Sequence, residues 1–191
     1  MKSEIKILLL CSYINVFAYA LFSPLYAVFV QRLDSNLLVI SSTWGVYALF
    51  QGIVMILFGK IEDHFKDKRP MIVAGYLLLS VGALSFAFIS TVTQLYLVQA
   101  INALANGILL PAWKSVYSKA QDKGKEAQEW SLFDGGNLIL ASIAAFVGGY
   151  IVTVVGFTWL FFIIFVFQLV TGLFSLSLLN KHQRSKKRLN R

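Results

Sequence analysis

Six long apolar runs, separated by short charged or turn-forming segments, constrain this chain more than any other feature of its sequence. Each run has 19–25 residues, and together they cover residues 7–30, 37–58, 71–90, 95–113, 131–155 and 157–179. A helix that crosses a bilayer needs about 20 predominantly apolar residues. Strands of a membrane barrel would instead alternate polar and apolar side chains, and these runs do not alternate. The sequence therefore predicts an all-α membrane protein, with a six-helix transmembrane bundle over residues 1–179.

The composition excludes most other classes of protein. Hydrophobic residues make up 58% of the chain and charged residues 14%, whereas soluble domains have about 45–50% and 25%. The single cysteine, Cys11, excludes a disulfide framework and a cysteine-ligated metal site. Both histidines, His64 and His182, lie outside the apolar runs, so the bundle lacks the residues of a membrane protease. We expect no enzymatic activity, no metal and no cofactor.

Basic residues predict the orientation in the membrane. Of the 17 Lys and Arg residues, sixteen fall on one side of the predicted bundle, and Arg32 falls on the other. Because basic residues concentrate in cytoplasmic segments, both termini are expected in the cytoplasm, in a protein of the plasma membrane. The tail 180–191 is expected to be a basic cytoplasmic segment. This topology, with attraction to anionic lipid, accounts for the net charge of +8 without a nucleic-acid partner.

Two prolines indicate an internal repeat. Pro24 lies in the outgoing part of the first run, and Pro111 lies in the outgoing part of the fourth. The first run starts in the cytoplasm and the fourth starts outside. The six runs are therefore predicted to form two three-helix units of opposite orientation, as in transporters with inverted repeats.

Polar side chains recur at helical spacing along several runs. The first run carries Ser12, Asn15, Tyr19, Ser23 and Tyr26, and the fourth carries Gln99, Asn102 and Asn106. Weaker stripes consist of Thr43, Tyr47 and Gln51 in the second run, and of Gln168, Thr171 and Ser175 in the sixth. Amides that face lipid would lack hydrogen-bond partners, so these faces point to protein or to water. Two interpretations stay open, namely interhelical hydrogen bonding or a solute cavity lined by Asn15, Tyr19, Ser23, Gln99, Asn102 and Asn106.

Charged residues are absent from the deep part of every run. Asp134 lies about one turn inside the cytoplasmic end of the fifth run, which suits a gate contact or a charge near a helix N-terminus. An intramembrane carboxylate usually marks a proton or sodium relay. The sequence therefore shows no evident coupling-ion site and no counter-ion for a charged solute.

The loop between the second and third runs carries a family resemblance. Residues 59–70 read GKIEDHFKDKRP, and Gly59, Asp63, Phe65, Lys68 and Arg69 match the pattern Gly-x-x-x-Asp-Arg-x-Gly-Arg-Arg with one residue inserted. From the residues alone, Gly59 would permit a tight turn, and Asp63 would cap a neighbouring helix. The loop resembles the signature loop of the major facilitator superfamily, although it departs from that pattern at His64 and Lys66. The resemblance implies that Gly59, Asp63, Lys68 and Arg69 form a gating loop.

The same resemblance implies a function for the bundle. Members of the superfamily normally have about twelve helices in two six-helix halves around a central cavity, and this chain resembles one amino-terminal half. We expect a transporter of a small neutral or amphipathic solute that works by alternating access as a homodimer, or with another half-transporter. Two alternatives stay open: a non-transporting membrane scaffold or subunit, and a fragment of a full-length transporter.

Overall fold

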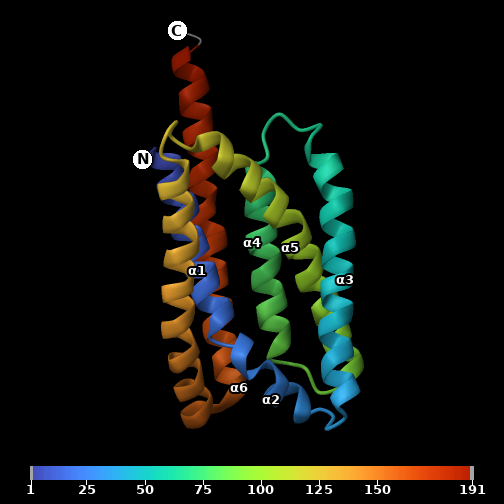
Figure 1. The fold of residues 1–191 in the computed structure, drawn as a ribbon. Coiled ribbons are helices and arrows are strands. Elements are labelled where there is room, and N and C mark those ends of the chain that lie inside the picture. The colour runs from blue at the N-terminus through green and yellow to red at the C-terminus, as the bar shows by residue number, and fades with distance from the viewer. Residues whose placement is uncertain (1, 190–191) are drawn as a thin grey trace.

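The computed structural model describes the backbone of residues 2–189 and the side chains of residues 2–179, and its regular structure is helical (Figure 1). The elements are α1 (Ser3–Ala20), the short 3-10 helix η1 (Ser23–Leu25), α2 (Tyr26–Gln31), α3 (Leu37–Glu62), α4 (Arg69–Phe86), α5 (Val92–Ala120) and α6 (Glu126–Leu189). The side chains of the predicted tail, 180–191, lie outside the described residues.

Five helices within the described residues are long and apolar enough to cross a membrane. The fifth, Glu126–Leu179, has 54 residues. At 1.5 Å per residue it would be about 80 Å long, more than twice the hydrocarbon core of a bilayer. Gly156 interrupts its helical geometry with φ 84° and ψ 176°, a conformation that glycine adopts without steric cost. Figure 1 shows the ribbon reversing direction near there, so that the orange part of α6 descends and the dark red part returns.

The two prolines predicted to mark a repeat affect their helices differently. Pro24 lies at the start of η1, where it follows the end of α1 and breaks the first span into two helices. Pro111 lies inside α5, which continues without a break from Val92 to Ala120. Proline removes a backbone donor in both places, but neighbouring helices can hold a proline-containing membrane helix together.

Helix pairs build the bundle around α4. α1 packs along α6, α3 packs along α5, and α4 contacts both α5 and α6. Glycines permit several of these close approaches: Gly107 lies against Val54 of α3, and Gly148 lies against the backbone of Leu21. At Gly135 and Gly149, in contrast, a Cβ would have no neighbour within 4 Å.

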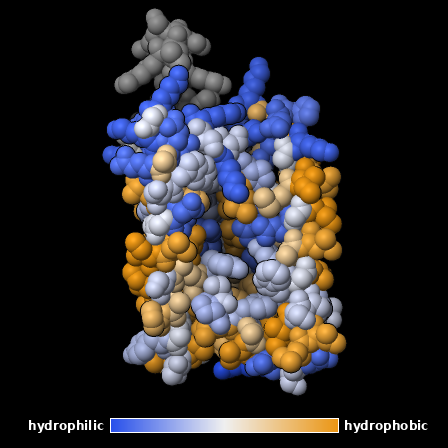
Figure 2. Space-filling view, in the orientation of Figure 1, coloured by the Kyte–Doolittle hydropathy of each residue, from blue (hydrophilic) through white to orange (hydrophobic). Residues whose placement is uncertain are grey.

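The two ends of the bundle differ in their packing and charge. α1 begins and α6 ends at the same end of the molecule, as Figure 1 shows. Hydrophilic side chains gather at that end, and below it hydrophobic ones cover the two flanks of the face shown in Figure 2. At the other end, five phenylalanines pack with ring centroids 4.9–6.3 Å apart; they are Phe22, Phe29, Phe86, Phe157 and Phe161. This aromatic cluster anchors the broken first span against α4 and the returning part of α6.

Candidate functional site

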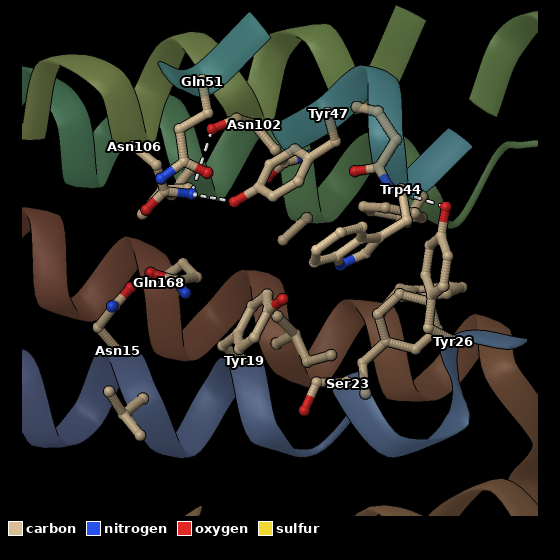
Figure 3. Close-up of a pocket in the computed structure, with 18 of the residues that line it drawn as sticks. Asn15, Tyr19, Ser23, Tyr26, Trp44, Tyr47, Gln51, Asn102, Asn106 and Gln168 are labelled. Atoms are coloured by element: carbon tan, nitrogen blue, oxygen red, sulfur yellow. Dashed lines mark hydrogen bonds between the residues drawn. The ribbon is translucent and has the colours of Figure 1, made fainter. Parts of the chain in front are cut away.

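A cavity of about 460 Å³ lies between the α1/α6 pair and the α3/α5 pair, with α4 behind it. Figure 3 shows the side chains from α1, η1, α2 and α6 on one side and those from α3 and α5 on the other. Tyr19 and Trp44 line the cavity and yet are 55% and 59% exposed. The described residues therefore leave the cavity open on one side, and Figure 2 shows a hollow in that face of the molecule.

The structure brings all six predicted cavity residues together. Asn15, Tyr19 and Ser23 come from the first span, and Gln99, Asn102 and Asn106 come from α5. The two stripes face each other because α1 and α5 present their polar faces to the same space (Figure 3). Their role in binding a solute stays a prediction. Ser12, although on the same stripe, lies outside the cavity and pairs with Asn137 of α6, with Asn137 Nδ2 donating to Ser12 Oγ over 3.1 Å.

Hydrogen bonds fix several polar groups of the cavity. Gln99 Nε2 donates to the Tyr26 hydroxyl at 2.9 Å, and that hydroxyl donates to Thr43 Oγ1 at 2.8 Å. Asn106 Nδ2 donates to the Tyr47 hydroxyl at 3.2 Å. These bonds link α5 to α2 and α3, so Gln99 and Asn106 join helices and also line the cavity.

Asn102 is held by its own helix. Its Nδ2 donates to the carbonyl oxygen of Val98 at 2.9 Å, and its side chain lies against Gly82 of α4. A methyl group at Gly82 would come within 2.5 Å of Asn102 Oδ1. Asn102 therefore contributes to the packing of α4 on α5 as well as to the cavity wall.

Several lining residues were not among the predicted set. Tyr47, Gln51 and Gln168 lay on the weaker polar stripes, whereas nothing in the pattern of the sequence pointed to Trp44. Gln168 is 4% exposed, and its Oε1 has no hydrogen-bond partner among the described residues. Asn15 Oδ1 is unpaired in the same way. Figure 3 shows both amides on the side of the cavity formed by α1 and α6.

The lining of the cavity combines amide and hydroxyl groups with a larger apolar and aromatic surface, and it carries no Asp, Glu, Lys, Arg or His among the described residues. No group of three potential metal ligands occurs there or elsewhere in the described part of the chain. Carboxamides, hydroxyls and aromatic rings can hydrogen-bond and stack against a solute. Such a lining suits an uncharged or amphipathic molecule better than an ion with a fixed counter-charge.

The predicted gating loop contains two ion-paired groups. Lys68 Nζ lies 2.6 Å from Asp63 Oδ1, within the loop itself. Arg69, at the start of α4, pairs with Glu4 of α1 at 2.6 Å and with Asp67 at 2.8 Å. The hydrogen bond from Lys68 lowers the pKa of Asp63, so the pair persists to acidic pH. The ion pair between Arg69 and Glu4 connects the end of the loop to the start of α1.

Two details of this loop differ from the prediction. Gly59 makes no tight turn, because α3 continues one turn beyond it to Glu62 with helical geometry. Asp63 does not cap a neighbouring helix, because its carboxylate pairs with Lys68. Asp67 accepts the hydrogen bond from the backbone N–H of Arg69 instead, at 3.1 Å.

Asp134, the predicted gate contact, lies at an exposed position of α6. No ion pair of Asp134 is found among the described residues. The alternative role, a charge near the helix N-terminus, is wrong because α6 begins at Glu126, more than two turns earlier, and its first turn holds Glu126 and Glu129.

Comparisons with known proteins support this architecture. A family model described as Major Facilitator Superfamily matches residues 8–191. The fold is similar to the in meso crystal structure of the POT family transporter PepTSo, with a TM-score of 0.74 and 18% identity over 92% of this chain and 37% of that chain. It is also similar to an auto-inhibited POT family peptide transporter, with a TM-score of 0.69 and 14% identity over 94% and 37%. No curated protein sequence matches significantly. The chain thus spans little more than a third of the length of these transporters.

Proposed function

Because this chain belongs to the Major Facilitator Superfamily, we propose that it moves a small neutral or amphipathic solute across a membrane by alternating access. The observation that carries the proposal is the uncharged cavity between α1 and α5, lined by amides and hydroxyls among apolar and aromatic side chains, which the described residues leave open on one side. Asn15, Tyr19, Ser23, Gln99, Asn102 and Asn106 would contact the solute, with Gln168 and Trp44 beside them. Six membrane crossings in two inverted repeats are part of this proposal, with the reversal at Gly156 as the fifth connection.

A second set of helices would complete the cavity. We propose a second copy of the chain in the same orientation, or another half-transporter, as the partner that closes the open side. The exposure of Tyr19 and Trp44 supports this proposal, as does α3, the least buried of the five membrane-capable helices. Rocking of the two halves would expose the cavity to each side in turn.

The cytoplasmic end would hold the gate. Gly59, Asp63, Lys68 and Arg69 belong to the loop that would bias one closed state, and exposed Asp134 would pair with a basic group of the partner. We propose that both termini are cytoplasmic and that the membrane is the plasma membrane. The Lys and Arg residues of the α3–α4 and α5–α6 connections lie at the end where α1 begins, and Arg32 lies at the other, which supports this orientation.

Thiol accessibility tests alternating access without knowledge of the solute. The native Cys11 is buried, so a cysteine placed at Ser23 would be the accessible thiol among the described residues. Ser23→Cys changes one atom of an exposed cavity residue. We expect a membrane-impermeant maleimide to label it from either side, in right-side-out and in inside-out vesicles.

The matched control is Ser142→Cys, which makes the same change at an exposed position of α6 outside the cavity. That thiol would face lipid and should stay unlabelled from both sides. Labelling of Ser23→Cys from one side only would contradict alternating access and favour a non-transporting scaffold.

A further inference from the structure

Glu62, the last residue of α3, is a buried carboxyl group that the proposed transport site does not use. Its side chain has 0% exposure, and neither Oε1 nor Oε2 has a hydrogen-bond partner among the described residues. Burying an ionised carboxylate without partners is far more costly than burying the neutral acid. The surroundings of Glu62 therefore favour the protonated form.

The position of Glu62 connects it to the predicted gating loop and not to the solute cavity. α3 has 26 residues, so it is about 39 Å long and extends beyond a hydrocarbon core of about 30 Å. Its last turn follows the apolar run 37–58 and carries Lys60 as well as Glu62. Glu62 thus lies at the water-facing end of the helix, directly before Asp63.

The charged groups around Glu62 shift its pKa in opposite directions. Desolvation by burial raises the pKa of Glu62 to about 7, with Lys68 opposing and Asp63 assisting the rise. Lys119 belongs to α5, the helix packed along α3, and its charge lowers the pKa of Asp63. His64 of the loop lowers the pKa of Asp63 as well. Arg69 of α4 is engaged with Glu4 and Asp67. Lys68 is therefore the cation for which Glu62 and Asp63 compete.

We propose that Glu62 is a proton-binding site that sets the state of the α3–α4 loop. In the conformation described here the acid carries its proton, and Lys68 pairs with Asp63 at 2.6 Å. When the proton leaves to cytoplasmic water, the new carboxylate must gain water or the Lys68 ammonium, and either change alters the last turn of α3 and the loop after it. That this change would gate solute movement rests on the function proposed above; the protonation itself does not.

The pH dependence of thermal unfolding tests the site in the intact chain. A folded-state pKa above the value of about 4.3 for free Glu contributes stability that is complete below about pH 4 and is lost progressively as pH rises from about 4.3 to about 7. We expect Glu62→Gln to match the wild type only near pH ~4, below both pKa values, and to exceed its Tm by on the order of 5 °C near pH ~8.5. The control is Glu126→Gln, which removes an exposed carboxylate in the first turn of α6. Its curve should stay parallel to that of the wild type.

Infrared spectroscopy provides a second readout that does not depend on a variant folding. The wild-type protein should show the carbonyl stretch of a protonated carboxylic acid near pH ~6, and the band should disappear near pH ~8.5. Parallel unfolding curves for the wild type and Glu62→Gln, or absence of the band from the wild type, would overturn the proposal. Neither readout involves a solute, so failure here leaves the transport proposal standing, and failure of Ser23→Cys labelling leaves the proton site standing.

Discussion

Glutamine side chains in the cavity show how one residue type takes different roles according to its partners. Gln99 uses its amide to hold the Tyr26 hydroxyl, whereas Gln168 is nearly fully buried with an unpaired Oε1. An unpaired buried oxygen costs free energy that a hydrogen bond would otherwise recover. The hydrogen bond of Gln99 thus stabilises the fold, whereas the unpaired oxygen of Gln168 contributes no such bond among the described residues.

This difference leads to a prediction for two matched substitutions. Gln168→Leu removes an unsatisfied buried group, so the stability of the protein should stay unchanged or rise. Gln99→Leu removes a hydrogen bond to Tyr26, so the free energy of unfolding should fall by about 1 kcal/mol. Thermal unfolding of the two purified variants measures both effects. A Gln168→Leu protein less stable than Gln99→Leu would show that the Gln168 amide has a structural partner.

At the scale of the elements, the break in the first span depends on close packing against α6. α1 ends at Ala20 and η1 begins at Ser23, so the backbone of Leu21 lies at the break. Gly148 of α6 presses against the carbonyl group of Leu21. This contact holds the polar face of α1 in register with the cavity, because a side chain at position 148 would push the two helices apart.

Neighbouring glycines on α6 test this contact. In Gly148→Ala the new Cβ would collide with backbone atoms of Leu21, which cannot move aside as a flexible side chain can. We expect a loss of about 1–3 kcal/mol in the free energy of unfolding. Gly149→Ala adds the same methyl group where no neighbour lies within 4 Å. It should be neutral or stabilising by up to about 1 kcal/mol, since alanine favours a helix over glycine.

Chemical or thermal unfolding in one detergent compares the two glycine variants directly. Equal stability of Gly148→Ala and Gly149→Ala would contradict the close contact at the break in the first span.

On the scale of the whole molecule, the open cavity raises the question of what closes it. α3 forms one wall of the cavity, and its Trp44 is exposed. Among the described residues no helix packs on the outer side of α3. Closed two-fold assembly gives each copy the same contact surface. The homodimer proposed above would therefore use the two open sides to enclose one shared cavity.

Native mass spectrometry of the chain released from lipid nanodiscs measures this assembly. We expect a dimer of the 21.4 kDa chain, because each copy leaves its cavity open toward the other. A monomer under conditions that preserve known membrane dimers would argue against the homodimer and direct the search to a separate half-transporter.

Parts of the architecture were predictable because they depend on local sequence. Helical spacing alone put Asn15, Tyr19 and Ser23 on one face, and the structure directs that face into the cavity. The same spacing grouped Gln168 with Thr171 and Ser175, yet Thr171 and Ser175 bond to their own helix and lie outside the cavity. Periodicity identifies a face, but it does not say how deep along the helix the cavity extends.

The sequence by itself determined that the chain forms apolar helices for a membrane, because the length and hydropathy of a run are properties of contiguous residues. It also determined which polar side chains share a helix face. The tertiary structure alone decided that the faces of α1 and α5 meet around one cavity, that Gly59 lies inside a helix, and that Glu62 is buried without a partner. These features depend on which helices pack together, and contacts between residues distant in sequence leave no pattern in a single chain.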